Sequence, residues 1–125
     1  MYFIQHIESI THQDSFQKEN LWKELKPLNS DHALISPDYK AYIPVAALRR
    51  LSTILRMGIA ASKECQEKTA LEFDSISVGT ALGCLTDTEK FLVTINTVSG
   101  DILSPTAFIQ STHNTISGQI SLDLK

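Results

Sequence analysis

The chain has 125 residues, with 11 lysines and arginines against 14 aspartates and glutamates, and a formal net charge of −3. This length predicts one domain that buries its own core, and the mild acidity excludes the clustered basic surface that binds nucleic acid. The longest apolar stretches are far shorter than a membrane span, so we expect a soluble protein that binds no membrane.

The two cysteines, Cys65 and Cys84, lie far apart and form neither a CxxC pair nor a metal-ligand spacing. Such cysteines indicate neither a disulfide framework nor a zinc site, and they suit the reducing cytoplasm. His6, His12 and His32 also lack a metal-binding spacing. The N-terminal MYFIQHIESI has no basic segment and no long apolar core, so it is not a signal peptide. We expect a cytoplasmic protein with no metal and no cofactor.

The N-terminal third of the chain gives weak signals. Its first ten residues favour a strand but are too few to decide. Residues 11–32 are polar and irregular and predict a loop. Within that loop, Leu21, Trp22 and Leu25 are spaced like one or two helical turns that end near Pro27.

The clearest predicted element is one long helix over residues 43–68. Apolar and small residues recur there at steps of one, three and four and form a single stripe. Gly58 and the small residues that follow it let this helix pack closely against a neighbour. Arg49, Arg50 and Glu64 lie off the stripe. The two arginines contact an acidic partner or a phosphopantetheine-type anion in one interpretation, and only solvent in the interpretation that we favour.

The next stretch predicts a strand, a glycine turn and a helix, which is a unit of α/β folds. The strand covers residues 73–79 and the turn covers residues 79–83. Thr86 and Glu89 together predict a capping box at the start of the helix. The apolar side chains of this strand and helix are Phe73, Ile76, Val78, Phe91, Leu92 and Ile95.

The last segment predicts a helix with Ser104 as its N-cap and Pro105 at its first position. Thr112, His113 and Asn114 fall on this helix among small and hydroxylated residues. In one interpretation they line a polar pocket or an interface. We favour a hydrogen-bonded core histidine, because buried polar groups must find partners.

Cys84 is the candidate nucleophile. A cysteine at a helix N-terminus has a lowered thiol pKa, and His113 would be its base. Nothing in the sequence places His113 beside Cys84, however, and a lone cysteine after a glycine turn is more often a small buried hydrophobe. The turn over residues 79–83 is neither GxGxxG nor a P-loop, so tight turning is favoured over phosphate binding.

Three segments in order resemble the N-terminal part of the β-ketoacyl-acyl-carrier-protein synthases of the thiolase-like superfamily. "LRRLSTILRMGIAASKEC" resembles the first long helix of the family, and "SISVGTALGCLTDTEKFL" resembles its strand, glycine turn and helix. "LSPTAFIQSTHNTISGQISL" resembles the stretch that leads to the nucleophile strand. The nearest resemblance is to the domain found in aryl-polyene and flexirubin-type pigment clusters.

The resemblance implies an α/β fold: a partial thiolase-like half-fold, with a few-stranded mixed sheet and packed helices. It implies that residues 1–125 form a single domain that lacks the segment with the catalytic cysteine and the C-terminal half. Cys84 does not align with the family nucleophile, and His113 aligns with neither catalytic histidine. No catalytic residue is therefore carried over, and Cys84, Thr112, His113 and Asn114 stay pocket or interface candidates.

The function that follows is a non-catalytic accessory or chain-length-factor-like subunit in fatty-acid or polyketide-type (aryl polyene) biosynthesis. Decarboxylative condensation needs a thiolate, histidines and amide donors, so we expect no condensation by this chain alone. The expected partners are a complete ketoacyl synthase or a second copy, and an acyl carrier protein. One alternative is the N-terminal fragment of a split synthase whose catalytic residues come from another chain. Another is a small cysteine-dependent acyl-transfer or hydrolytic enzyme that uses Cys84 and His113.

Overall fold

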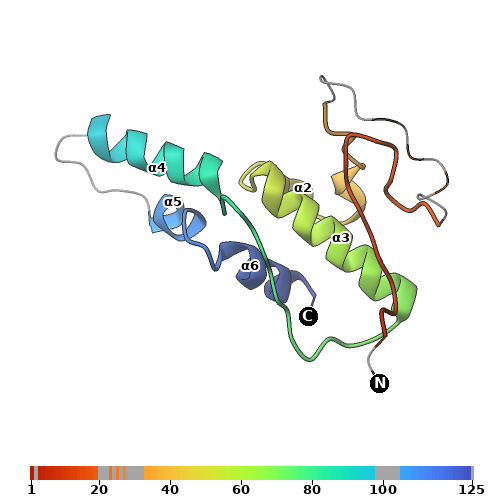
Figure 1. Cartoon of the computed structure of the whole chain (residues 1–125). Helices are drawn as coiled ribbons and strands as arrows, with labels where there is room; N and C mark the ends of the chain where they lie inside the picture. The colour runs from red at the N-terminus through yellow and green to blue at the C-terminus, as the bar shows by residue number, and fades with distance from the viewer. Residues whose placement is uncertain are drawn as a thin grey trace.

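The computed structural model describes residues 1, 3–19, 23, 25, 27, 33–97 and 105–124. Within these residues the regular structure is helical, and extended segments connect the helices (Figure 1). The elements are η1 (Tyr39–Ala41), α2 (Val45–Leu48), α3 (Thr53–Thr69), α4 (Leu85–Thr97), α5 (Pro105–Gln110) and α6 (Thr115–Asp123).

The expected α/β fold, a partial thiolase-like half-fold with a few-stranded mixed sheet, is wrong for the described part of the chain, which contains no strand. Residues 73–79, the predicted strand, are extended but have no backbone partner there, and Phe73 and Val78 are exposed. A strand persists only where a neighbour satisfies its N–H and C=O groups. The apolar spacing instead reflects an extended segment whose Ile76 packs on the helical core.

The helix predicted over residues 43–68 is interrupted. α2 ends at Leu48 and α3 begins at Thr53, because Ser52 adopts the extended conformation of an N-cap (ψ 165°). The Arg56 side chain donates to the Leu51 carbonyl oxygen at 2.8 Å and fixes the turn. Residues on both sides of the break face the same core, so the apolar stripe continues across it. Periodicity alone therefore did not predict the turn.

The core lies where α3 and α6 pack against each other (Figure 1). Leu55 and Ile59 of α3 are buried with Ile116 and Ile120 of α6. Gly58 allows the close approach, since a Cβ atom added there would lie 3.4 Å from Cδ1 of Ile120. The predicted role of the small residues in close helix packing is confirmed at this position.

α4 and α5 form a second pair of helices (Figure 1). The rings of Phe91 and Phe108 meet at a centroid distance of 5.6 Å. The helix predicted after the glycine turn is thus confirmed, but the capping box is displaced. The carbonyl oxygen of Cys84 accepts the N–H groups of Asp87 and Thr88, so Cys84 and not Thr86 precedes the first turn.

The predicted C-terminal helix is divided in two by a turn over residues 111–114. Pro105 is the first residue of α5, as expected. Ser104, Leu21 and Trp22 lie outside the described residues. No helix in the described part of the chain is long and apolar enough to cross a membrane.

Candidate functional site

The α5–α6 turn lies against the N-terminus of α4. The Thr88 hydroxyl donates to the Ser111 carbonyl oxygen at 3.1 Å and to the Cys84 carbonyl oxygen at 3.1 Å. His113 is next to Gly83, since a Cβ added to that glycine would lie 3.6 Å from Cδ2 of His113. The fold therefore brings the predicted residues Cys84, Thr112, His113 and Asn114 to one junction, which the sequence alone did not indicate.

Cys84 does not have the properties of a nucleophile. Its side chain is 2% exposed and belongs to the same core cluster as Ile116. Burial first, and the nearby Asp87 second, raise the pKa of the Cys84 thiol. Within the described part of the chain no hydrogen bond joins His113 to Cys84, and His113 is exposed. The interpretation of Cys84 as a small buried hydrophobe is the one that fits this geometry.

The three other candidates, Thr112, His113 and Asn114, all lie in the turn between α5 and α6. The Thr112 hydroxyl donates to the Ile109 carbonyl oxygen at 3.0 Å and lies 3.1 Å from the Thr115 hydroxyl. Asn114 precedes α6 as its N-cap residue without a side-chain capping bond. The favoured placement of His113 in the core is wrong, because the predicted helix breaks there and leaves the imidazole exposed.

Sequence reasoning missed Asp87 at this junction. Its side chain is buried, and its Oδ2 atom has no hydrogen-bond partner among the described residues. The sequence analysis did not identify Asp87 because it took Thr86 as the N-cap and Glu89 as its capping partner. With that helix start, Asp87 is expected on the exposed side. Asp87 follows Cys84 by three residues, and residues three apart lie on the same face of a helix. This spacing was the signal that could have predicted the burial of Asp87.

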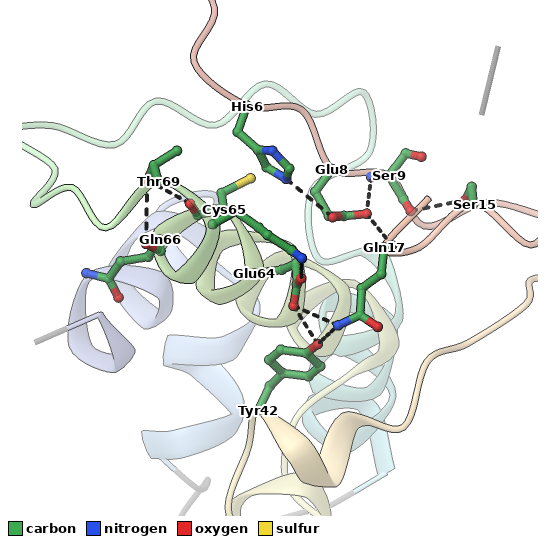
Figure 2. Close-up of polar contacts among 11 residues, drawn as sticks. His6, Glu8, Ser9, Ser15, Gln17, Tyr42, Glu64, Cys65, Gln66 and Thr69 are labelled. Carbon is green, nitrogen blue, oxygen red and sulfur yellow. Dashed lines mark hydrogen bonds and ion pairs between the residues drawn. The ribbon is translucent and has the colours of Figure 1, made fainter. Parts of the chain in front are cut away.

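A second polar cluster surrounds Glu64, which is 2% exposed on α3 (Figure 2). The Tyr42 hydroxyl donates to Glu64 Oε2 at 2.7 Å, and the Gln17 side-chain amide donates to the same oxygen at 3.0 Å. Lys68 Nζ lies 3.8 Å from Glu64 Oε1. Glu64 was expected off the apolar stripe, and that expectation is wrong; its spacing of four residues from the buried Ala60 was the available signal.

The hydrogen-bond and ion-pair partners of Glu64 favour its ionised carboxylate form. Burial alone would raise the pKa of the Glu64 carboxyl, but the donors Gln17 and Tyr42 and the charge of Lys68 bring the pKa below its ordinary value. Burial and the hydrogen bond to Glu64 raise the pKa of the Tyr42 hydroxyl well above its usual range. The pair therefore stays as a carboxylate and a neutral phenol, which is an arrangement for stability and not for proton transfer.

His6, Glu8 and Cys65 complete this cluster (Figure 2). His6 Nε2 lies 3.5 Å from Glu8 Oε2. Burial, followed by the charges of Glu8 and Glu64, raises the pKa of the Cys65 thiol, so the chemistry of a reactive thiolate is disfavoured here too. In the described part of the chain, no group of three His, Cys, Asp or Glu side chains is arranged to hold a metal ion.

The model of one protein family, described as beta-ketoacyl synthase, N-terminal domain, matches residues 20–125, which is well over half of the chain. The chain belongs to this family. Comparison with curated proteins and with solved structures gave no match. The match confirms the family resemblance, and it contains all three segments on which that resemblance was based.

Within this β-ketoacyl synthase N-terminal domain, the buried Cys84 and the exposed His113 both lie in the matched stretch. Gln17 and Glu8 precede it, whereas Tyr42 and Glu64 lie within it. The polar cluster around Glu64 therefore joins a segment outside the family match to the first long helix inside it.

Proposed function

We propose that this β-ketoacyl synthase N-terminal domain acts as a non-catalytic, chain-length-factor-like subunit that docks on a complete synthase. The observation that carries the proposal is the state of Cys84: this candidate nucleophile at the α4 junction is 2% exposed, has a raised thiol pKa and has no hydrogen bond to a histidine among the described residues. Acyl transfer needs an accessible thiolate, so the described residues supply none at this junction. The alternative of a small enzyme that uses Cys84 is disfavoured for the same reason.

The exposed surface supports a docking role. Large apolar side chains are exposed on α4 and α5, namely Leu85, Leu92, Val93, Ile95, Phe108 and Ile109. Apolar surface of this extent on adjacent helices is typical of an interaction site.

An acyl carrier protein is the second partner that we propose. Arg49 and Arg50 are both exposed in the turn between α2 and α3, and neither forms an ion pair within the described residues. Free guanidinium groups suit carboxylates or a phosphopantetheine phosphate. This assigns to the two arginines the alternative role that the sequence left open. Aryl-polyene assembly is the pathway that we propose on the earlier resemblance.

Co-purification with the complete synthase from an adjacent reading frame tests the docking proposal. We expect a stable complex by size-exclusion chromatography with light scattering, and Leu92→Asp should weaken it at least tenfold. Asn96→Asp adds the same charge to an exposed polar position of α4 and should leave it intact. A free monomer at micromolar concentration of both chains would refute the proposal.

The same preparation distinguishes the split-synthase alternative. A complete synthase should condense acyl groups with or without this domain, which would change only product length. If the second chain alone were inactive and the mixture were active, the domain would be part of a split enzyme. Cys84→Ala should leave the activity of either mixture unchanged.

A further inference from the structure

The connection from α3 to α4 includes residues 71–79, whose backbone has no partner (Figure 1). Neither their N–H and C=O groups nor their side chains form a hydrogen bond with any described residue. Only Ile76 is half-buried, where it packs on the core, and the other side chains of this stretch are exposed. After a bend at Asp74, residues 75–79 contain no further bend or turn. These five residues therefore present open backbone to the surroundings, and we call them the open segment.

A groove of about 600 Å³ lies beside the open segment. Residues 76–80 line it together with Ile10 and with Met57, Gly58 and Ala61 of α3. The glycine and the alanine leave room above the helix for side chains from elsewhere. Open backbone next to such a groove fits an extended chain. The backbone of that chain would bond to the open segment, and its alternate side chains would enter the groove.

Acidic side chains precede the open segment. Glu67, Glu72 and Asp74 are exposed, and none of them forms an ion pair with a described residue. Lys68, the nearest lysine along the chain, pairs instead with the buried Glu64 at 3.8 Å. The charge at this end of the segment is thus left uncompensated. Charge complementarity therefore favours a partner that carries lysine or arginine side chains.

The same charges disfavour a second copy of this chain as the occupant. Two copies of residues 71–79 would bring their own carboxylates together, and this stretch contains no lysine or arginine. The N-terminal residues 3–10 carry Glu8 and no basic residue either. Like charges opposite each other destabilise paired strands, and the whole chain has a net charge of −3. A different, basic chain is therefore the better partner.

We propose that the open segment is a strand-addition site for an extended, basic segment of a partner protein. The partner pairs its backbone with residues 75–79 and places alternate apolar side chains in the groove beside α3. The pairing is between two chains and leaves the helical fold of the domain unchanged. Five residues of strand span about 17 Å. The site is separate from the exposed apolar side chains of α4 and α5, so the inference goes beyond the proposed docking on a synthase.

Residue-resolved hydrogen exchange of the full chain by NMR tests the pairing. The probe is a short peptide of alternating lysine and valine, acetylated and amidated at its ends. In the free chain, the amides of residues 75–79 should exchange without protection, because they have no acceptor. At saturating peptide, every second amide of the open segment should gain protection of about tenfold or more, since alternate residues of a strand bond to the same neighbour. Binding through charge alone would not produce this alternation.

Matched controls separate backbone pairing, charge and the α4 surface. A peptide of alternating glutamate and valine should bind about tenfold more weakly. Adjacent N–H groups of a strand point to opposite edges, so either Ser77→Pro or Val78→Pro removes a donor from the paired edge and should abolish the protection. Ser77→Ala and Val78→Thr keep the N–H group and should bind like the parent. Leu92→Asp on α4 should also leave peptide binding unchanged.

Several outcomes would overturn the proposal. They are no binding of the lysine peptide at about 1 mM, equal binding of the glutamate peptide, and protection confined to residues outside 75–79. Retained protection in both proline variants would also overturn it. Protection of the open segment that rises with the concentration of the free chain would identify a second copy as the occupant and refute a basic partner. None of these results depends on whether the domain docks on a synthase.

Discussion

Replacement of Tyr42 by phenylalanine removes one hydroxyl and nothing else from the cluster around Glu64. That hydroxyl donates to Glu64 Oε2 at 2.7 Å, and Glu64 is almost completely buried. The ring contact with Phe16, edge to face at 5.6 Å, is kept. The substitution therefore removes this hydrogen bond, together with the one that the same hydroxyl accepts from the Gln17 side-chain amide at 3.0 Å, and keeps the ring packing.

Hydrogen bonds to buried charged groups contribute about 1.5–3 kcal/mol, and Tyr42→Phe should reduce the free energy of unfolding by that amount. The Gln17 amide still donates to the same carboxylate, so the loss should fall below that of leaving Glu64 with no partner. Urea denaturation followed by circular dichroism measures it.

Tyr39→Phe is the matched control. Among the described residues, the Tyr39 hydroxyl reaches only the exposed Ser36 hydroxyl, at 3.5 Å, and its removal should change stability by less than about 0.5 kcal/mol. A double-mutant cycle of Tyr42→Phe with Glu64→Gln should show a coupling of about 0.5–3 kcal/mol. Equal losses in the two tyrosine variants, or no coupling to Glu64, would refute the reasoning.

Three further predictions concern single groups. The folded-state pKa of Glu64 lies below its ordinary value of 4.5. The stability that the ionised Glu64 contributes is therefore complete above pH 4.5 and is lost as the pH falls through the folded-state pKa. The unfolding midpoint of the parent should fall more steeply with acid than that of Glu64→Gln, and parallel curves would contradict this. Gly83→Ala should destabilise by about 1–2 kcal/mol because φ is +58°, whereas Gly79→Ala, with nothing within 4 Å of its Cβ, should be neutral or stabilising in the same thermal scan. At pH 7 Cys84 should alkylate at least tenfold more slowly than a free cysteine, because burial raises its thiol pKa; rapid labelling would restore the thiol-enzyme hypothesis.

The sequence predicted those elements in which local signals and packing agree. Pro105 begins α5, and Gly58 lies at the closest approach of α3 and α6, because the missing N–H of proline and the missing Cβ of glycine act through the local backbone. The family resemblance rested on three segments and on their order along the chain. That order does not depend on how the segments pack in the fold. These features did not need knowledge of distant contacts.

The strand predicted over residues 73–79 and the placement of His113 required such knowledge. Alternation of apolar residues shows that an extended segment has one covered face, but not whether its backbone has a partner. The turn before α6 likewise depends on where Thr112 and Thr115 place their hydroxyls. Glu64 was missed for a related reason: the donors that satisfy its buried carboxylate, Tyr42 and Gln17, are 22 and 47 residues away along the chain.

The exposed apolar side chains of α4 and α5 and the polar cluster around Glu64 lie on different helices and have different consequences. The exposed apolar side chains on α4 and α5 favour a partner for that pair of helices, whereas α3 is stabilised by α6 and by the donors of Glu64. A synthase bound at α4 would stabilise the domain by mass action, but it would not replace the hydrogen bond of Tyr42. Since sites without shared partners contribute additively, loss of that bond should reduce stability equally in the free and the docked domain. Unequal losses would mean that docking reorganises α3 itself.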